Sequence, residues 1–474
     1  MISARASAIC VFALLILRAV MAAQLPLSAD EAYYWLWSQH LAAGYFDHPP
    51  MIAWLIRAGT ALFGDTPFGV RFAGVLLSLP ASWFVWRAAG LILKDATRAG
   101  MAVLFFNLTL MASVELLAAT PDMPSLVTSA AFVYFLARVQ QTGDSRAWLG
   151  AGIAAGLGLL SKYSVLFLGA GALVWLILER DARKWLLSPW PYAGAVLALA
   201  IFAPNLAWQS QHHWQTFLFQ FGRIGAGHFT LRFVGEFLAA QIGLASPLLL
   251  LLMAAGLWRA TRPGSDRLML AILIWTGLGY FFQHALHDRV QGNWPCFLYP
   301  ALAILAADAF ALTGIFWRRV SVFAAPLAAL LLLAVYLLAV WTPDIKGLKN
   351  PLARILGREF APIGEVVAAL VKAHLADAVL TTDYQTTAWL RFNYPGLKVV
   401  QLNEPQRYPD APAAGTVLLA RPLIYLAEFR RDQHFLVQKF FAYTGFPTQL
   451  QTPSSLYMVY PVGRPKSSQL GRMP

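Results

Sequence analysis

The chain has 474 residues, of which 58% are hydrophobic and 12% are charged. Soluble domains average about 25% charged residues, so this composition excludes an ordinary soluble enzyme and indicates a chain solvated mostly by lipid. A net charge of +13 suits a nucleic-acid-binding protein, but excess Lys and Arg in the cytoplasmic loops of a membrane protein explains it better. The two cysteines, Cys10 and Cys296, supply neither a disulfide framework nor a metal cluster.

About eleven apolar stretches approach the roughly 20 residues that a membrane-spanning helix needs. They cover residues 7–25, 67–86, 100–118, 122–139, 147–160, 164–179, 190–208, 236–257, 268–284, 295–313 and 320–341. Residues 147–179 fit either two short helices or one long helix, and their glycines favour close packing over lipid exposure. We predict a mainly α fold: a polytopic membrane helical bundle of about 11 spans within residues 1–341.

Residues 1–23 also have features of a secretory signal, with Arg5, an apolar core and Val-Met-Ala before Ala23. Cleavage there would leave the rest of the topology unchanged. We expect an uncleaved helix instead, because such a helix would hold Asp30 at a fixed depth at the membrane surface.

The basic residues predict the orientation. One side of the membrane collects most of them: Arg5, Arg87, Lys94, Arg98, Arg138, Arg146, Arg180, Arg183, Lys184, Arg259, Arg262, Arg267, Arg318 and Arg319. The other side holds fewer: Arg57, Lys162, Arg223, Arg232 and Arg289. By the positive-inside rule the first side is cytoplasmic. The N-terminus is therefore predicted to be cytoplasmic, and the loop 26–66 and everything after residue 341 extracytoplasmic.

Residues 342–474 have a different composition, with frequent prolines and an ordinary density of charge. Helix-like stretches near 361–375 and 384–392 alternate with short apolar runs. These runs are Ala378–Thr382, Leu397–Leu402, Thr416–Ala420 and Leu456–Tyr460. The alternation predicts a small α/β domain outside the membrane.

Two adjacent acids, Asp30 and Glu31, follow the first apolar stretch and precede an aromatic segment. Capping explains one acid, if Ser28 or Asp30 starts a helix that lies in the membrane interface. Two adjacent acids in so apolar a chain are less expected. We therefore interpret them as candidate catalytic residues, with Asp30 the better candidate for a base and Glu31 a support for the loop.

The next polar cluster is Asp47-His48-Pro49-Pro50, in which the two prolines impose a stiff turn. Its acid and imidazole are either simply solvated or, with Asp30 and Glu31, form a site for a divalent cation or a phosphate. The spacing matches no known zinc motif. Because carboxylates and an imidazole can bind metal ions, a divalent cation is a possible cofactor, but the sequence does not identify the metal.

Asp122 lies in a short outward turn, where it either starts a helix or serves as a further catalytic acid. Glu115 sits within the preceding apolar stretch, and intramembrane acids are functional candidates by default. Lys162 interrupts a glycine-rich apolar run. Its ammonium group either reaches to the lipid headgroups or binds a lipid phosphate.

Two later outward loops carry Arg223 and Arg289 among aromatic residues. Such loops either bind a phosphate and a sugar or form part of the aromatic belt at the membrane surface. No Walker loop, dinucleotide fingerprint, nucleophile elbow or metalloprotease helix is present in the sequence.

Taken together, these motifs resemble the C-type glycosyltransferase superfamily, in particular bacterial relatives of protein O-mannosyltransferases, lipid A aminoarabinose transferases and rhizobial galacturonosyltransferases. The resemblance covers roughly residues 20–315 and extends more weakly through the tail. The motifs that carry it are Asp30-Glu31-Ala-Tyr-Tyr, Gly44-Tyr45-Phe46-Asp47-His48-Pro49-Pro50, Phe63-Gly64 with Arg71, Thr120-Pro121-Asp122, Ser161-Lys162-Tyr163, Ala203-Pro204-Asn205 with Trp208, and Asn293-Trp294-Pro295.

The resemblance implies an inverting enzyme of the bacterial inner membrane that uses a polyprenyl-phosphate sugar as donor. The acceptor would be a lipid such as lipid A, another glycan or a protein, and no nucleic acid is expected. Asp30 matches the acid usually assigned as general base, and Asp122 matches a further acid. Asp47-His48 stands where some relatives carry Glu-Lys, associated with metal or donor phosphate. His48 in place of lysine departs from that pattern.

The leaving group of such a reaction is a lipid phosphate, so Lys162, Arg223 or Arg289 could offset its developing charge. The main alternative is a transporter or flippase of lipid-linked sugars, but the sequence has neither the repeated halves nor the broken midplane helices typical of transporters. A second alternative is a scaffold that uses its tail as a binding module.

Overall fold

The computed structural model describes residues 3–222, 228–341, 350–408, 410–467 and 470–474. The chain divides into two compact units. The first unit comprises Met1–Ala23, Ala42–Leu55 and Arg71–Tyr336, and the second comprises Gln24–Leu41, Ile56–Val70 and Leu337–Pro474. The second unit therefore combines the C-terminal region with two segments from the N-terminal part of the chain.

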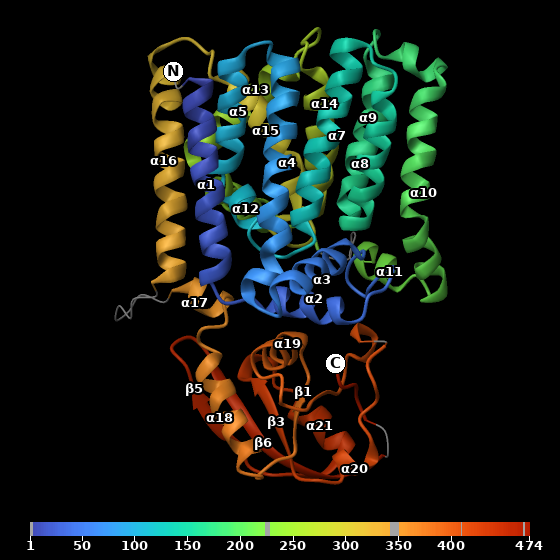
Figure 1. The fold of residues 1–474 in the computed structure, drawn as a ribbon, viewed down its shortest axis with the longest axis vertical. Helices are drawn as coiled ribbons and strands as arrows, with labels where there is room; N and C mark the ends of the chain where they lie inside the picture. Colours follow the sequence, from blue (N-terminus) through green and yellow to red (C-terminus); the bar gives the residue numbers. More distant parts are fainter. Residues whose placement is uncertain (1–2, 223–227, 342–349, 409, 468–469) are drawn as a thin grey trace. The chain divides into compact units, whose positions relative to one another are not determined.

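The first unit is a helical bundle (Figure 1). Its helices, some of which have an end in the second unit, are α1 (Ala4–Gln24), α3 (Met51–Phe63), α4 (Pro67–Leu93), α5 (Ala96–Leu108), α6 (Leu110–Glu115), α7 (Asp122–Thr142), α8 (Ala147–Ser161), α9 (Leu166–Leu178), α10 (Pro189–Gln211), α11 (Gln215–Phe221), α12 (Arg232–Ala245), α13 (Pro247–Ala260), α14 (Leu268–Ala285), α15 (Tyr299–Ala309) and α16 (Ile315–Val340). Short 3-10 turns, η1 (Tyr163–Val165), η2 (Arg183–Leu187) and η3 (Trp294–Leu298), connect several of them.

Every apolar stretch predicted to span the membrane falls on one or two of these helices, so the predicted helical membrane bundle is confirmed. Among the described residues, five helices are long and apolar enough to cross a membrane: α1, α4, α10, α14 and α16. The pair α12 and α13 makes a sixth if it is one bent span. The remaining stretches lie on shorter apolar helices, or on the more polar α7.

The stretch predicted to span the membrane over residues 236–257 is not one continuous helix. The chain bends there by 107° between α12 and α13. Ser246 takes a left-handed backbone (φ 74°) and is followed by Pro247. Proline has no amide hydrogen and its ring clashes with the preceding helical turn, so one helix cannot continue through this point.

Residues 147–179 form two helices, which decides between the two alternatives. The α8 helix ends at Ser161, Lys162 is extended (φ −157°, ψ 134°), and η1 leads into α9. The glycines in α8 do allow close packing, as predicted. A Cβ atom on Gly152 would lie 2.1 Å from the carbonyl oxygen of Gly194, so α8 and α10 approach backbone to backbone.

The C-terminal part of the second unit is an α/β domain, as predicted, built on a mixed sheet (Figure 1). Its strands are β1 (Ala378–Thr381), β2 (Val399–Gln401), β3 (Leu423–Glu428), β4 (Phe441–Thr444), β5 (Thr448–Gln451) and β6 (Leu456–Pro465). Their order is β2-β1-β3-β6-β4, with β5 also paired to β6. The strands β2, β1 and β3 run parallel, and β6 is antiparallel to β3, β4 and β5.

Helices and turns flank this sheet in sequence: α17 (Pro351–Ile355), α18 (Ala361–Lys372), α19 (Tyr384–Asn393), η4 (Pro405–Arg407), α20 (Thr416–Leu419), η5 (Phe429–Arg431) and α21 (His434–Phe440). Three of the four predicted apolar runs overlap strands, but Thr416–Ala420 forms the single-turn helix α20. Apolar runs this short fit a strand or a helical turn equally well. The α19 helix connects the parallel strands β1 and β2 as a βαβ unit.

The second unit also contains α2 (Ala29–Gln39), which packs against α19. Trp389 on α19 donates through Nε1 to the carbonyl oxygen of Leu27 at 3.1 Å. The rings of Trp35 and Phe392 meet edge to face with their centroids 5.1 Å apart. These contacts fix the N-terminus of α2, and with it Asp30 and Glu31, against the α/β domain.

Candidate active site

Glu31 closes the N-terminus of α2. The Ser28 hydroxyl accepts the amide N–H of Glu31 at 3.3 Å, and the Glu31 carboxylate accepts the amide N–H of Ser28 at 2.9 Å. This reciprocal arrangement is a capping box, which satisfies two backbone donors that the helix leaves open. Glu31 is buried, so its geometry fits the predicted supporting role in the loop.

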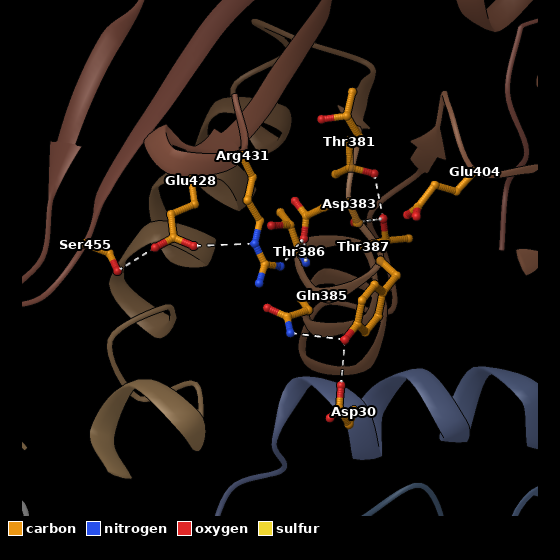
Figure 2. Close-up of polar contacts among 12 residues, drawn as sticks. Asp30, Thr381, Asp383, Gln385, Thr386, Thr387, Glu404, Glu428, Arg431 and Ser455 are labelled. Atoms are coloured by element: carbon orange, nitrogen blue, oxygen red, sulfur yellow. Dashed lines mark hydrogen bonds and ion pairs between the residues drawn. The ribbon is translucent and has the colours of Figure 1, made fainter. Parts of the chain in front are cut away.

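Asp30 is exposed beside Glu31 and contacts α19 (Figure 2). The hydroxyl of Tyr384 donates to Oδ1 of Asp30 at 2.9 Å, and Nε2 of Gln385 donates to the Tyr384 hydroxyl at 3.2 Å. A carboxylate in the first turn of a helix also interacts favourably with the helix dipole. Both interactions stabilise the Asp30 carboxylate at the start of α2.

Tyr384 lies in a cluster of aromatic and charged side chains within the second unit. Its ring centroid is 4.9 Å from that of Tyr33 and 4.8 Å from the guanidinium carbon of Arg407. Arg407 in turn donates through Nε to Glu404 at 2.9 Å. Sequence reasoning missed Tyr384 and Arg407, because neither lies in a motif and both follow α2 by more than 340 positions.

In the first unit, Asp122 and Lys162 form a buried ion pair. The Lys162 ammonium lies 2.6 Å from Oδ1 and 2.8 Å from Oδ2 of Asp122, and the two side chains are only 12% and 4% exposed. Asn293 donates to Oδ2 at 2.8 Å, and the thiol of Cys296 donates to Oδ1 at 2.9 Å. The structure thus brings two candidate site residues together and adds two partners.

The break between α8 and η1 makes this ion pair possible. Lys162 is extended there, and Asp122 occupies the first turn of α7. Glu115 is buried as well, accepts the Thr120 hydroxyl at 3.0 Å and interacts electrostatically with Lys162. With both acids ionised, one ammonium faces two carboxylates, so a donor phosphate at Lys162 would compete with Asp122 for the cation.

Asp47 and His48 lie in a loop held by a buried polar network. The Thr216 hydroxyl donates to the carbonyl oxygen of Tyr45 at 2.6 Å, and Gln220 donates to that of Asp47 at 2.6 Å. The amide of Tyr45 donates to the carbonyl oxygen of His48 at 3.2 Å, which closes the turn. Among the described residues, no group of three or more His, Cys, Asp or Glu side chains is arranged to hold a metal ion.

The same network reaches the residue that follows Lys162. Gln209 is fully buried and donates to the hydroxyls of Tyr163 and Thr216 at 3.0 and 2.7 Å. Tyr163 donates to Asn205 at 2.9 Å, and Asn205 donates to the carbonyl oxygen of Ala43 at 2.8 Å. The loop that carries Asp47 and the helix break that carries Lys162 are therefore connected through buried hydrogen bonds.

Of the two arginine candidates, Arg223 lies outside the described residues. Arg289 is more than half exposed and pairs through Nε with Glu236 at 2.8 Å. Its guanidinium carbon also lies 6.0 Å from the ring centroid of Phe233. Within the described part of the chain, the ion pair of Arg289 is this surface contact with Glu236. The buried acid Asp122 is paired with Lys162 and not with Arg289.

Residues 47–208 match the family model of dolichyl-phosphate-mannose-protein mannosyltransferases. This stretch contains Asp47, His48, Asp122 and Lys162. The structure of ArnT from Cupriavidus metallidurans bound to undecaprenyl phosphate superposes with a TM-score of 0.65 at 18% identity, covering 95% of this chain and 97% of ArnT. The fold is thus that of ArnT, and the predicted resemblance to the C-type membrane glycosyltransferases is confirmed.

Two curated relatives narrow the comparison. The lipid A galacturonosyltransferase RgtD of Rhizobium johnstonii is 30% identical over 291 residues, which cover 58% of this chain and 59% of RgtD. The undecaprenyl phosphate-alpha-4-amino-4-deoxy-L-arabinose arabinosyl transferase 1 of Sodalis glossinidius is 30% identical over 295 residues, which cover 57% of this chain and 50% of the relative. The chain thus spans half to three fifths of these relatives.

The ion pair predicts a specific pattern of stability. Replacing Asp122 by Asn removes the carboxylate in direct contact with the buried Lys162 ammonium, which destabilises the fold by about 3–5 kcal/mol. The double variant Asp122→Leu/Lys162→Met removes both charges and should recover most of that loss. Thermal unfolding of the purified protein in detergent measures both effects, and a wild-type Tm for Asp122→Asn would contradict the assigned pairing.

The buried network predicts a local effect on the first loop. Gln209→Leu removes donors to Tyr163 and Thr216 and should cost roughly 1–3 kcal/mol. Hydrogen exchange of residues 42–50 should become faster, because their anchor through Thr216 is weakened. Gln211→Leu, on the exposed side of the same helix, is the matched control, and equal exchange in the two variants would disprove the anchoring role.

Proposed function

We propose that this protein is an inverting glycosyltransferase that moves a sugar from a polyprenyl-phosphate donor to an acceptor on the extracytoplasmic face of the bacterial inner membrane. The observation that carries the proposal is Asp30, an exposed carboxylate in the first turn of α2 that accepts a hydrogen bond from Tyr384. The names of the curated relatives, which are galacturonosyl and aminoarabinosyl transferases, support the reaction class.

In this reaction Asp30 takes the proton of an acceptor hydroxyl while the hydroxyl oxygen attacks the anomeric carbon. The bond between that carbon and the donor phosphate breaks, the configuration inverts, and the polyprenyl phosphate leaves with the bonding electrons. Lys162 is the cation proposed to offset the charge of the leaving phosphate. Asp122 holds the Lys162 ammonium, and Asn293 and Cys296 in turn donate to Asp122. Asp122 then acts by orienting Lys162, since its oxygens are already engaged.

The acceptor is proposed to be lipid A or a lipopolysaccharide core. The names of RgtD and of a second relative, the lipopolysaccharide core galacturonosyltransferase RgtA of Rhizobium johnstonii (29% identical over 199 residues), support this class. The comparisons do not favour a transporter, because the curated relatives named above are transferases. The superposed ArnT is bound to undecaprenyl phosphate, which supports a polyprenyl-phosphate donor.

A reconstituted transfer assay tests the proposal. Purified protein is given polyprenyl-phosphate galacturonic acid or aminoarabinose together with lipid A, and transfer is followed by mass spectrometry. Asp30→Asn should lower kcat by at least about 100-fold, the range expected for loss of a general base. Retention of wild-type kcat in Asp30→Asn would remove Asp30 from the mechanism, and donor movement across vesicles without product would favour the flippase.

Glu31→Gln provides the neighbouring comparison, because glutamine can also complete a capping box. A supporting role predicts that this variant keeps its Tm and that its kcat falls far less than that of Asp30→Asn. A loss of kcat equal to that of Asp30→Asn, at an unchanged Tm, would instead assign Glu31 to the chemistry.

The proposed orientation places the N-terminus in the cytoplasm and residues after 341 on the extracytoplasmic side. The excess of basic residues in one set of loops supports it. Alkaline phosphatase fused after residue 474 should be active in intact cells. Green fluorescent protein fused at the same position and exported by the general secretion route should not fluoresce. The reverse pattern would invert the topology.

A further inference from the structure

We propose that Tyr384 is a positioning residue for Asp30, so that the C-terminal α/β domain takes part in the reaction through one hydroxyl group. The inference rests on the proposed function, in which Asp30 is the general base. The Tyr384 hydroxyl donates to Oδ1 of Asp30 at 2.9 Å, and both residues belong to the second compact unit.

The donors and acceptors give this hydrogen bond its direction. The side-chain amide of Gln385 donates through Nε2 to the Tyr384 oxygen at 3.2 Å. The single hydroxyl proton of Tyr384 is then available to Asp30, whose ionised carboxylate can only accept. The hydrogen bonds that join Gln385, Tyr384 and Asp30 therefore restrict the rotation of the Asp30 carboxylate (Figure 2).

Tyr384 is itself held rigidly, because it occupies the first position of α19 directly after its cap. The Asp383 carboxylate accepts the amide N–H of Thr386 at 2.9 Å, and its carbonyl oxygen accepts the Thr387 hydroxyl at 2.7 Å. Thr387 also bonds to Thr381, at the end of β1, at 2.8 Å. A hydroxyl carried on such a cap is fixed relative to the sheet rather than to a mobile loop.

The ring of Tyr384 makes a second contact with the same helix as Asp30. It packs on Tyr33 with the centroids 4.9 Å apart, and Tyr33 lies three positions after Asp30, on the same side of α2. The guanidinium of Arg407 lies 4.8 Å from the Tyr384 centroid and 5.7 Å from that of Tyr33. Ring packing therefore holds α2 and α19 in register, and the hydroxyl donates to Asp30.

All three parallel strands direct charged groups toward this region from the same end. Asp383 follows β1, Glu404 and Arg407 follow β2, and Glu428 ends β3. Arg431 lies 3.4 Å from Asp383 and 4.0 Å from Glu428, so it joins the ends of β1 and β3 (Figure 2). The carboxyl ends of parallel strands are where open α/β sheets usually place functional groups.

The test is Tyr384→Phe, which keeps the ring packing and removes only the hydroxyl. A hydrogen bond to a charged group predicts a fall in kcat of about 10- to 100-fold, with unchanged KM for donor and acceptor and an unchanged Tm. Tyr394→Phe is the matched control. It removes a hydroxyl at the other end of α19 that donates to the carbonyl oxygen of Ala361 at 3.0 Å, and it should keep wild-type kcat.

The outcomes separate this inference from the proposed function. If Asp30→Asn abolishes transfer while Tyr384→Phe keeps wild-type kcat, the positioning role is overturned and the base assignment stands. If Tyr384→Phe loses kcat only together with Tm, or no more than Tyr394→Phe does, the role of the hydroxyl is structural and the inference also fails. If Asp30→Asn is fully active, the base assignment itself is the part that fails.

Adding Tyr384→Phe to Asp30→Asn gives a double-mutant cycle. If Tyr384 acts through Asp30, the residual transfer of the double variant should equal that of Asp30→Asn, because the two effects are not additive. A further fall of about 10-fold in the double variant would assign Tyr384 an effect independent of Asp30 and overturn the inference.

Discussion

Where water is excluded, the protein itself must satisfy backbone N–H and C=O groups, so a helix can break only where protein groups replace its lost hydrogen bonds. At the end of α5, the Thr109 hydroxyl donates to the carbonyl oxygen of Phe106 at 2.8 Å and accepts the amide of Ala112 at 3.2 Å. At the end of α8, the amide of Lys162 still reaches the carbonyl oxygen of Gly158 at 2.8 Å, and its ammonium finds Asp122. The end of α8 at Ser161 thus brings the Lys162 ammonium to the carboxylate of Asp122.

In the second unit, the sheet and the N-terminal cap of α19 fix the position of the Tyr384 side chain. The β1 strand ends, Asp383 caps α19, and Tyr384 projects onto α2. The Tyr384 ring packs against the guanidinium of Arg407 and the ring of Tyr33. The Tyr384 hydroxyl donates a hydrogen bond to Asp30. The segment that carries α2 and a domain more than 300 residues later in the chain thereby belong to one compact unit.

Apolar length and turn chemistry were enough to predict the helices, the α/β tail and the capping of α2, because each of these depends on neighbouring residues. The bend at Ser246 was missed because the apolar run continues across it, although Pro247 was a local sign of a break. Asp122 and Lys162 were both identified, but their pairing depends on how α7 and α8 pack, which no local pattern encodes. No sequence pattern indicates the role of Tyr384, because a single tyrosine after a helix-capping acid is common in proteins.

Gly44 shows that a motif can carry less information than its letters suggest. A Cβ atom at this position would lie 2.5 Å from the indole of Trp208 and 2.8 Å from the amide of Asn205. The glycine of the first-loop motif and the Asn-Leu-Ala-Trp of α10 therefore belong to the same packing contact, in which Gly44 leaves room for Trp208 and Asn205. A match to both motifs therefore reports one packing contact, and it says nothing about the chemistry proposed for Asp30 and Lys162.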